Sequence, residues 1–417
     1  MKIGFFTDTY SQVNGVTVTI KAVEQNLRDL GHEVYIFAPR GEAENLKNNP
    51  YLFTSQAIRF IFSPEYQWAI FPVFTIPQSN LGLDIIHVHS PISMGLAGLM
   101  NARRLAIPCI GSIHTLLPEF WKPFLEKYIS LVTPPLLKRA IKQFLSLFDH
   151  FSIVNTTLDL RLSLVEQLSW RYMVEFFKRC DLSLVPSTYA QNECLNHGLT
   201  TQILPNGIDF AKFQLPRDPS VFNKRWNLDP QDRLLIYAGR LSEEKNIDLI
   251  LNSAPTILKT TDHLKYMIIG DGPHRNALEK LVEKNQISEN VIFTGYLNSS
   301  GLSECYSRAM LYINPSPFET QGLSVIEAMY FGCPILSVNS GGVAELIDNS
   351  TSGLLCENTP EALTRTLLAV LEDQSILKKY RVNAKVTASE YDIKKFCKQL
   401  IAIYEQLLTK KTSQLKW

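Results

Sequence analysis

Short apolar runs alternate with longer amphipathic stretches along the whole chain. Near the N-terminus, stretches of helical periodicity over residues 18–30 and 94–105 separate the runs KIGFFT, EVYIFA, LDIIHVHS and PCIGSIHT. This alternation predicts βαβ units, in which helices cover both faces of a parallel sheet. The pattern starts again after Pro205, where five runs predict further strands: RLLIYAGR, KYMIIGDG, NVIFTGYL, MLYINPS and PILSVN.

The two blocks of alternation predict an α/β protein with two doubly wound domains. A chain of 417 residues is long enough to bury two substantial cores. Pro, Asn and Gly cluster in ILPNGIDF, so we expect one domain over residues 1–205 and a second over residues 206–392.

Composition narrows the class of protein. Hydrophobic residues make up 45% of the chain, charged residues 19%, and the formal net charge is +1, as in a globular protein without a nucleic-acid partner. The seven cysteines are scattered and form no C-x-x-C pair, which disfavours a disulfide framework or a zinc site. Because no leader pattern or long apolar run stands out, we expect a cytoplasmic protein whose membrane contact is peripheral.

Glycines follow several of the predicted strands, where ligands of open parallel sheets bind. Gly15 follows the first strand, while Gly239 and Gly270 follow two strands of the second block. These loops match neither G-x-G-x-x-G nor G-x4-G-K-[ST]. A dinucleotide-dependent oxidoreductase and a P-loop hydrolase therefore lose their main support.

The stretch PSPFETQGLSVIEAM places two carboxylates, Glu319 and Glu327, around a turn that opens a predicted helix. A helix N-terminus favours an anion through its dipole and its unpaired N–H groups. In GRLSEEKN, Arg240 offers a planar fork of donors and Lys245 a compact charge, which suits a diphosphate. Taken alone, each stretch is more typical of a capped helix or of solvated surface than of a ligand site.

The order of these pieces resembles one known family. A glycine loop, a histidine in GSIHT, then PNGID, GRLSEEK, GDGP, FTGY, the E-x7-E stretch and SGGVAE are similar to the retaining glycosyltransferases of family 4. That family has the GT-B fold, two Rossmann-like domains that face each other across a cleft. The segments NGV, VHSPISMGLAGL and SIHTLLPEF most resemble its glycolipid-forming members, such as diacylglycerol glucosyltransferases and the sulfolipid and mannolipid synthases.

The resemblance implies a role for each candidate residue. Arg240 and Lys245 would bind the diphosphate of a nucleotide-sugar donor and stabilise its growing charge. Glu319 would bind the donor sugar, Glu327 the ribose, and His114 would face the sugar. The other implied donor-binding positions are Gly15, Gly239, Gly270, Tyr296, Gly322, Leu323 and Ser324, and Glu345 would support the loop at Gly341 and Gly342.

The implied mechanism is a front-face displacement, in which the leaving phosphate helps to take the acceptor proton. No further acid in the motifs suggests the nucleophile that a covalent route needs. Asp-x-Asp is absent from the sequence, so we expect no metal-anchored donor and no bound cofactor, and stimulation by bulk Mg²⁺ is left open. His87 and His89 share a strand face without a third ligand, and we interpret them as structural.

Two segments complete the expected organisation. Residues 393–417 predict a C-terminal helix that packs back on the N-terminal domain, and residues 116–180 predict a helical insertion. In the insertion, two prolines at 134 and 135 start a helix with one apolar half and one basic half, the latter formed by Lys138, Arg139 and Lys142. This profile is typical of an interfacial helix and equally of a helix packed on a domain. We expect residues 121–148 to contact an anionic membrane.

Four functions remain open from the sequence. We expect a transferase that moves a hexose, glucose from UDP-glucose, to a lipid acceptor such as diacylglycerol. The alternatives are a soluble family 4 hexosyl- or mannosyltransferase that uses GDP-mannose on a sugar, a phospho-acceptor or a protein, and a nucleotide-sugar epimerase. A non-catalytic binding module is disfavoured by the complete set of Arg240, Lys245, Glu319 and Glu327.

Overall fold

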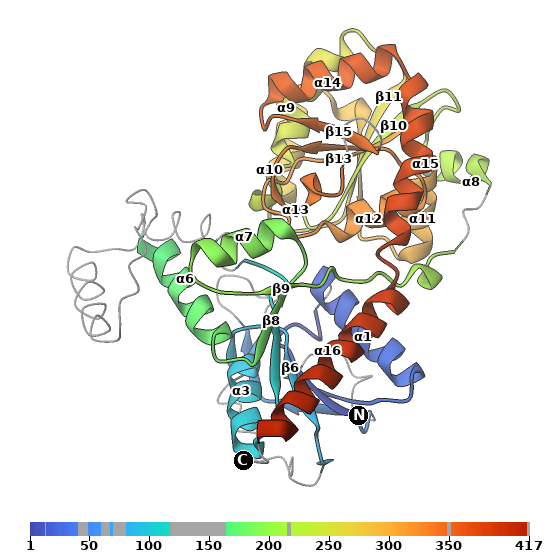
Figure 1. The fold of residues 1–417 in the computed structure, drawn as a ribbon. Helices are drawn as coiled ribbons and strands as arrows, with labels where there is room; N and C mark the ends of the chain where they lie inside the picture. Colours follow the sequence, from blue (N-terminus) through green and yellow to red (C-terminus); the bar gives the residue numbers. More distant parts are fainter. Residues whose placement is uncertain are drawn as a thin grey trace.

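The computed structural model describes residues 1–12, 14–40, 49–59, 67–69, 81–116, 118, 164–214, 218–347 and 352–414. Two parallel sheets, one in each half of the chain, form the centres of two α/β domains (Figure 1). The helix predicted to start at residues 134 and 135, and the membrane-contact segment 121–148 that contains it, lie outside the described residues and stay predictions.

The sheet of the N-terminal half has the strand order β3-β2-β1-β6-β7-β8-β9, and its pairs are parallel. The order reverses direction between β1 and β6, which are neighbours in the sheet. The strands span Lys2–Phe6 (β1), Glu33–Pro39 (β2), Leu52–Ser55 (β3), Ile85–Val88 (β6), Cys109–Ser112 (β7), Leu182–Val185 (β8) and Gln202–Ile203 (β9). A small antiparallel pair joins Ala57–Arg59 (β4) to Gln67–Ala69 (β5).

The sheet of the C-terminal half has the order β12-β11-β10-β13-β14-β15, also with parallel pairs. Its direction reverses between β10 and β13. The strands span Arg233–Ala238 (β10), Leu264–Ile269 (β11), Val291–Gly295 (β12), Leu311–Asn314 (β13), Ile335–Val338 (β14) and Gly353–Cys356 (β15). The structure thus contains the nine predicted strands and adds others that the sequence pattern did not reveal.

Helices cover both faces of each sheet. In β10, Leu235 and Tyr237 join one apolar cluster while Leu234 and Ile236 join another, as expected when side chains alternate along a strand. Helices of the first cluster are Asp248–Leu258 (α9), Arg275–Lys284 (α10) and Pro360–Glu372 (α14). The helices that contribute to the second cluster are Pro219–Trp226 (α8), Ser299–Arg308 (α11), Leu323–Tyr330 (α12) and Ser375–Ser389 (α15). Helix α15 also contributes to the first cluster.

The N-terminal core explains two other helical patterns. Helix α1 (Gly15–Asp29) begins earlier than the pattern predicted, because the Asn14 side chain accepts a hydrogen bond from Thr17 N at 2.9 Å and caps the helix. Helices α3 (Ser93–Leu105) and α6 (Leu164–Phe177) share one core, in which Trp170 and Phe177 are buried. Helix α7 (Thr188–Asn196) follows β8.

The chain crosses between the two halves twice, and the crossings lie side by side. Ile208 pairs with Asp392, and Ile393 N donates to Ile208 O at 3.0 Å. A Cβ at Gly207 would lie 2.7 Å from Ile393 Cα, so this approach needs a glycine. Beyond the second crossing, α16 (Ile393–Gln414) runs along the N-terminal half and packs on α1, with Phe396, Leu400 and Tyr404 in the core (Figure 1). The domain boundaries at 205 and 392 remain our prediction.

Candidate functional site

The candidate residues gather where each sheet reverses its strand order. In open α/β sheets this reversal creates a crevice beyond the carboxyl ends of the strands. Gly239 and Arg240 follow β10, and the segment from Pro315 to Gly322 follows β13. In the N-terminal sheet, the loop before Gly15 follows β1, and His89 follows β6. The two crevices supply the predicted residues from both halves of the chain.

Lys245 and Glu319 form an ion pair in this region. Nζ of Lys245 lies 2.7 Å from Oε1 of Glu319, and each side chain is 24% exposed. Lys245 ends the 3-10 turn η3 (Glu243–Lys245), which lies beyond the partly buried Arg240. The structure therefore places in direct contact two residues to which the family resemblance assigns adjacent parts of a donor.

Glu327 lies one turn inside α12 and is bound by two donors that the sequence analysis missed. Lys212 Nζ lies 3.0 Å from its Oε1, and the Tyr306 hydroxyl donates to its Oε2 at 3.1 Å. Burial raises the pKa of Tyr306 well above its ordinary value, so this phenol stays a donor. Lys212 belongs to the 3-10 turn η2 (Phe210–Lys212) just beyond the first crossing, and no local sequence signal links it to Glu327.

The N-termini of two helices, α1 and α12, lie close together at the site. Gly322 precedes α12 with a φ of 78°, and a Cβ there would lie 2.3 Å from Val343 Cγ2, so the turn requires glycine. Backbone N–H groups at the start of a helix have no intrahelical partner, and those of Leu323 and Ser324 belong to this class. Gly15, the first residue of α1, would place a Cβ 3.4 Å from Leu323 Cδ1. Both dipoles thus favour an anion between the halves.

The loops after β10 and β11 are in backbone contact. Gly270 has a φ of 125°, and a Cβ there would lie only 1.9 Å from Gly239 O. Only glycine fits this approach, which places the two loops next to each other. Tyr296 follows β12 and is 61% exposed at the edge of this group, with its hydroxyl donating to Asp271 O at 3.3 Å.

His114 links the two halves. Its carbonyl oxygen accepts a hydrogen bond of 2.8 Å from Thr320 Oγ1, one residue after Glu319. Its ring Nε2 lies 3.1 Å from Nδ1 of His89, and burial lowers the pKa of His114 to about 4. The His114 ring is therefore neutral at physiological pH.

His87 and His89 stack with their ring centroids 4.1 Å apart, as their shared strand face predicts. Both ring nitrogens of His87 are paired, Nδ1 with Tyr404 Oη and Nε2 with Ser112 Oγ, each at 2.7 Å. Burial lowers the pKa of His87 to about 3. Within the described ranges, no group of three or more His, Cys, Asp or Glu residues is arranged to hold a metal.

Glu345 bridges the halves at a second place. Its carboxylate accepts hydrogen bonds from the backbone N–H groups of Thr188, at 2.9 Å, and of Tyr189 in the first turn of α7. The loop that Glu345 was expected to support is held by Glu319 itself, whose carbonyl oxygen accepts from Gly342 N at 2.6 Å. Glu345 therefore acts as an anionic cap on a helix of the other domain.

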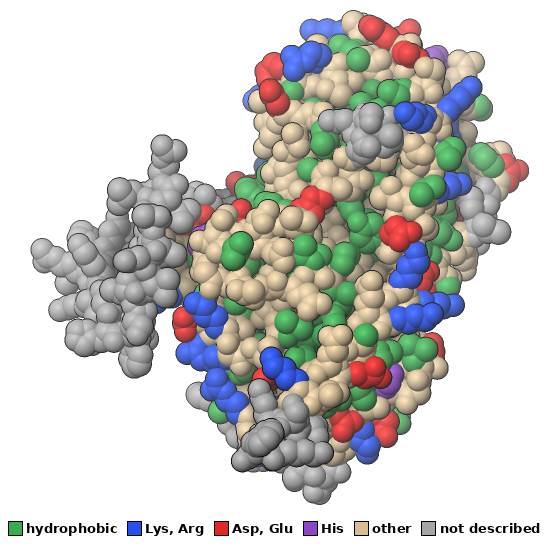
Figure 2. Space-filling view, viewed as in Figure 1, with side chains coloured by type: hydrophobic (Ala, Val, Ile, Leu, Met, Phe, Trp, Pro, Cys, Tyr) green, Lys and Arg blue, Asp and Glu red, His purple; other side chains and the backbone are tan. Residues whose placement is uncertain are grey.

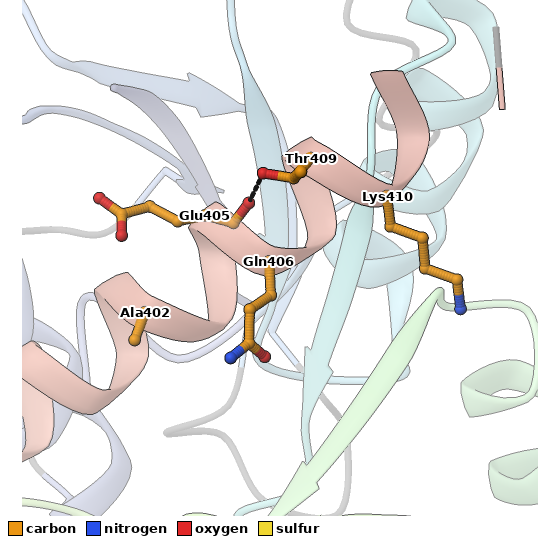
Figure 3. Close-up of a pocket in the computed structure, with 5 residues that line it drawn as sticks. All are labelled: Ala402, Glu405, Gln406, Thr409 and Lys410. Carbon is orange, nitrogen blue, oxygen red and sulfur yellow. Dashed lines mark hydrogen bonds between the residues drawn. The ribbon is translucent and has the colours of Figure 1, made fainter. Parts of the chain in front are cut away.

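The rest of the described surface shows fewer features that indicate a functional site. Acidic and basic side chains are interspersed over the face shown in Figure 2. A hollow of about 510 Å³ is lined by outward residues of α16, including Glu405, Gln406 and Lys410 (Figure 3). None of the residues that line it belongs to the candidate site. In the described part of the chain, no helix has both the length and the apolar composition to cross a membrane.

Two family descriptions match the chain. Residues 13–212 match Glycosyltransferase Family 4. Residues 220–387 match the family described as Glycosyl transferases group 1. The first range carries Gly15 and His114, and the second carries Arg240, Lys245, Glu319 and Glu327.

The relatives of this chain include glycolipid synthases. It is 29% identical to the alpha-monoglucosyldiacylglycerol synthase of Streptococcus pneumoniae, over 85% of this chain and 75% of that protein. It is 23% identical to the synthase of the same name from Acholeplasma laidlawii, over 100% and 99% of the two chains. A GDP-mannose-dependent alpha-mannosyltransferase of Mycobacterium tuberculosis is 24% identical, over 97% of this chain and 96% of that protein.

Solved structures share the fold. Sucrose-phosphate synthase from Thermosynechococcus elongatus has a TM-score of 0.76 and 16% identity, over 98% of this chain and 100% of that chain. HepE from Anabaena, determined in complex with UDP, has a TM-score of 0.72 and 17% identity, over 97% of this chain and 100% of that chain. These likenesses confirm the predicted arrangement of two Rossmann-like domains.

Proposed function

Because this chain belongs to glycosyltransferase family 4 and is a hexosyltransferase of the GT-B fold, we propose that it transfers glucose from UDP-glucose to a lipid acceptor such as diacylglycerol. The contact between Lys245 and Glu319 carries this proposal. It unites a cation suited to a diphosphate with a carboxylate suited to sugar hydroxyls, at the crevice where open α/β sheets bind ligands.

In the proposed donor complex, the diphosphate lies between the starts of α1 and α12, next to Arg240 and Lys245. These groups stabilise the negative charge that grows on the leaving phosphate. Glu319 accepts hydrogen bonds from the sugar, and Glu327, oriented by Lys212 and Tyr306, accepts them from the ribose. The acceptor hydroxyl bonds to the anomeric carbon on the face from which the phosphate leaves, and the leaving phosphate takes its proton, so the anomeric configuration is retained without a covalent enzyme intermediate.

The acceptor assignment has separate support. Two relatives are named alpha-monoglucosyldiacylglycerol synthase, and one of them aligns over 100% of this chain. We propose that residues 121–148 provide the contact with an anionic membrane surface, in a protein that stays on the cytoplasmic side. The mannosyltransferase relative supports a second candidate, mannosyl transfer from GDP-mannose.

A donor and acceptor matrix tests the proposal. Purified protein is incubated with UDP-glucose or GDP-mannose, in the presence of diacylglycerol vesicles or a water-soluble sugar acceptor, with and without Mg²⁺. We expect a glucosyl-diacylglycerol mass in the lipid extract only with UDP-glucose. Product formed solely from GDP-mannose, or solely on the soluble acceptor, would replace this proposal with the alternative.

A further inference from the structure

Three buried or partly buried imidazoles lie in a row behind the candidate site. His89 stacks between the other two, with ring centroids 4.1 Å from His87 and 5.4 Å from His114. Of the three, only His114 has an expected role toward the donor, because the family resemblance places it facing the sugar. His89 is buried, and its ring is hydrogen-bonded through Nδ1 to His114 Nε2 at 3.1 Å.

Backbone groups fix the direction of the hydrogen bonds between Asn206 and Gln321. Gln321 Nε2 donates to the carbonyl oxygen of Asn206 at 3.0 Å, which only an amide nitrogen can do. Gln321 Oε1 is therefore the acceptor, and it receives Asn206 N and Asn206 Nδ2, each at 2.8 Å. The side-chain oxygen of Asn206 takes no part in this pair and can act as an acceptor near His114.

A nitrogen without a partner indicates the protonation of both histidine rings. His89 Nε2 is buried and has no hydrogen-bond partner among the described residues. Buried N–H groups without a partner are rarer than unpaired acceptors, so the proton of the neutral His89 ring belongs on Nδ1. His89 Nδ1 then donates to His114 Nε2, and the neutral His114 ring carries its own proton on Nδ1. Burial is the larger influence on the pKa of His114, and the Asn206 side chain acts against it, as an amide oxygen near the ring does.

We propose that His89 is a positioning residue for glycosyl transfer, which holds the neutral His114 ring in its Nδ1–H tautomer against the donor loop. His89 is hydrogen-bonded to His114, and Asn206, which is hydrogen-bonded to Gln321, acts on the pKa of the same His114 ring. Thr320 adds a bond to the His114 carbonyl oxygen. His89 thus holds the ring at Nε2, and the backbone of His114 is held from the same loop as Glu319. The catalytic part of this inference rests on the proposed placement of His114 beside the donor sugar.

Nitrogen-15 NMR of the histidine rings tests the tautomers without any substrate. The chain has eight histidines, so single substitutions assign their signals. At pH 7 we expect both His89 and His114 as the Nδ1–H tautomer, the opposite of the form that free imidazole side chains favour. An Nε2–H signal from either ring would overturn the inference, whatever the enzyme transfers.

Substitutions test the effect on turnover. His89→Phe keeps the ring but removes the donor, so we expect a mixture of His114 tautomers, turnover lower by about tenfold, and unchanged affinity for UDP. His89→Asn returns an N–H near the position of Nδ1, and we expect it to restore most of the turnover. Tyr404→Phe is the matched control, because it removes a buried bond to His87 without contact to His114.

The variants also separate this role from a structural one. Combined with His114→Ala, His89→Phe should add no further loss, since its effect passes through His114. Wild-type turnover in folded His89→Phe, no rescue by His89→Asn, or fully additive losses would each overturn the positioning role. Failure of wild-type protein to transfer glucose to diacylglycerol would contradict the proposed function and leave the tautomer result intact.

Discussion

Lys245 Nζ and Glu319 Oε1 lie 2.7 Å apart, so the cation proposed for the diphosphate and the carboxylate proposed for the sugar are each other's partner. Both side chains remain about a quarter exposed, with 24% accessible in each. A diphosphate that binds beside Lys245 competes with Glu319 for the ammonium group. The sugar hydroxyls of the same donor then offer Glu319 replacement hydrogen bonds.

Loss of either proposed phosphate-binding cation should slow the chemical step. In Arg240→Ala or Lys245→Ala we expect kcat to fall by about 100-fold or more, because the charge opposite each side chain grows in the transition state. KM should change less, since ground-state binding uses the same contact more weakly. Initial rates over a range of donor concentrations measure both constants.

Lys280→Ala is the control for this comparison, as Lys280 is exposed on α10 of the same domain. Its kinetics should match the wild type. Wild-type turnover in folded Arg240→Ala or Lys245→Ala would remove that residue from the proposed diphosphate site.

The cap that Glu345 forms on α7 should influence the relative arrangement of the two domains. Glu345→Ala removes a charge from a helix N-terminus, and such an exposed charge is worth about 0.3–1 kcal/mol. We expect kcat/KM for the donor to fall by about two- to fivefold, with a broader distribution of domain arrangements in small-angle scattering. Glu361→Ala, in the first turn of α14, removes a comparable charge within one domain and should leave both readouts unchanged. Equal behaviour of the two variants would show that the cap does not couple the domains.

The strand pattern predicted the centre of each sheet better than its edges. The predicted strands KIGFFT and RLLIYAGR correspond to β1 and β10. Both have nearly continuous apolar residues, as is typical of strands that are buried on both faces. The edge strands β9 and β15 were missed. β9 has only two residues, and β15 begins at a glycine, so pairing with a neighbour defines each strand more than local composition does.

The sequence predicted candidate site residues where they lie in contiguous motifs, such as GRLSEEKN and the E-x7-E stretch. The pair of Lys212 with Glu327 spans 115 positions, and the pair of Asn206 with Gln321 spans the same separation. Neither pair has a local signal, because the chain brings its partners together only after both domains have formed. His89 was interpreted as structural for the same reason: its link to His114 depends on the neighbouring positions of β6 and β7.

The buried histidines should make the protein less stable in acid. Burial lowers the pKa of His87 to about 3 and that of His114 to about 4, below the ordinary value of 6.5 that the unfolded chain retains. Below pH 6.5 the unfolded state binds more protons than the folded state, so the free energy of unfolding falls as pH falls. Each such histidine contributes a slope of about 1.4 kcal/mol per pH unit between pH 6 and its folded pKa.

Urea unfolding between pH 7 and pH 4.5 measures this slope in the wild type and in His87→Gln. Burial raises the pKa of Asp8 and of Glu24, which gives the opposite slope in both proteins, so the difference between the proteins isolates the histidine. We expect the slope of the free energy of unfolding against pH to be smaller in the variant by about 1.4 kcal/mol per pH unit, the contribution of one titrating group. Identical slopes would mean that His87 is not held neutral by burial.

The two glutamates of the E-x7-E stretch should separate in their ligand preference. Glu327→Gln should weaken UDP and UDP-glucose alike by about tenfold or more, because a hydrogen bond to a charged group is worth roughly 1.5–3 kcal/mol and both ligands carry the ribose. Tyr306→Phe removes one of the donors that orient Glu327, and it should weaken both ligands in the same proportion but by less.

Glu319→Gln should act on only one of the two ligands. It removes the charge paired with Lys245, which leaves that ammonium group more available to a diphosphate, so affinity for UDP should be kept or increased. UDP-glucose loses charge-assisted hydrogen bonds from its sugar to Glu319, so its affinity and its turnover should both fall. Isothermal titration calorimetry of both ligands with Glu319→Gln, Glu327→Gln and wild-type protein makes the comparison. Equal losses for UDP and UDP-glucose in Glu319→Gln would refute the separate roles, because a carboxylate that binds only the glucose cannot weaken the binding of UDP, which has no glucose.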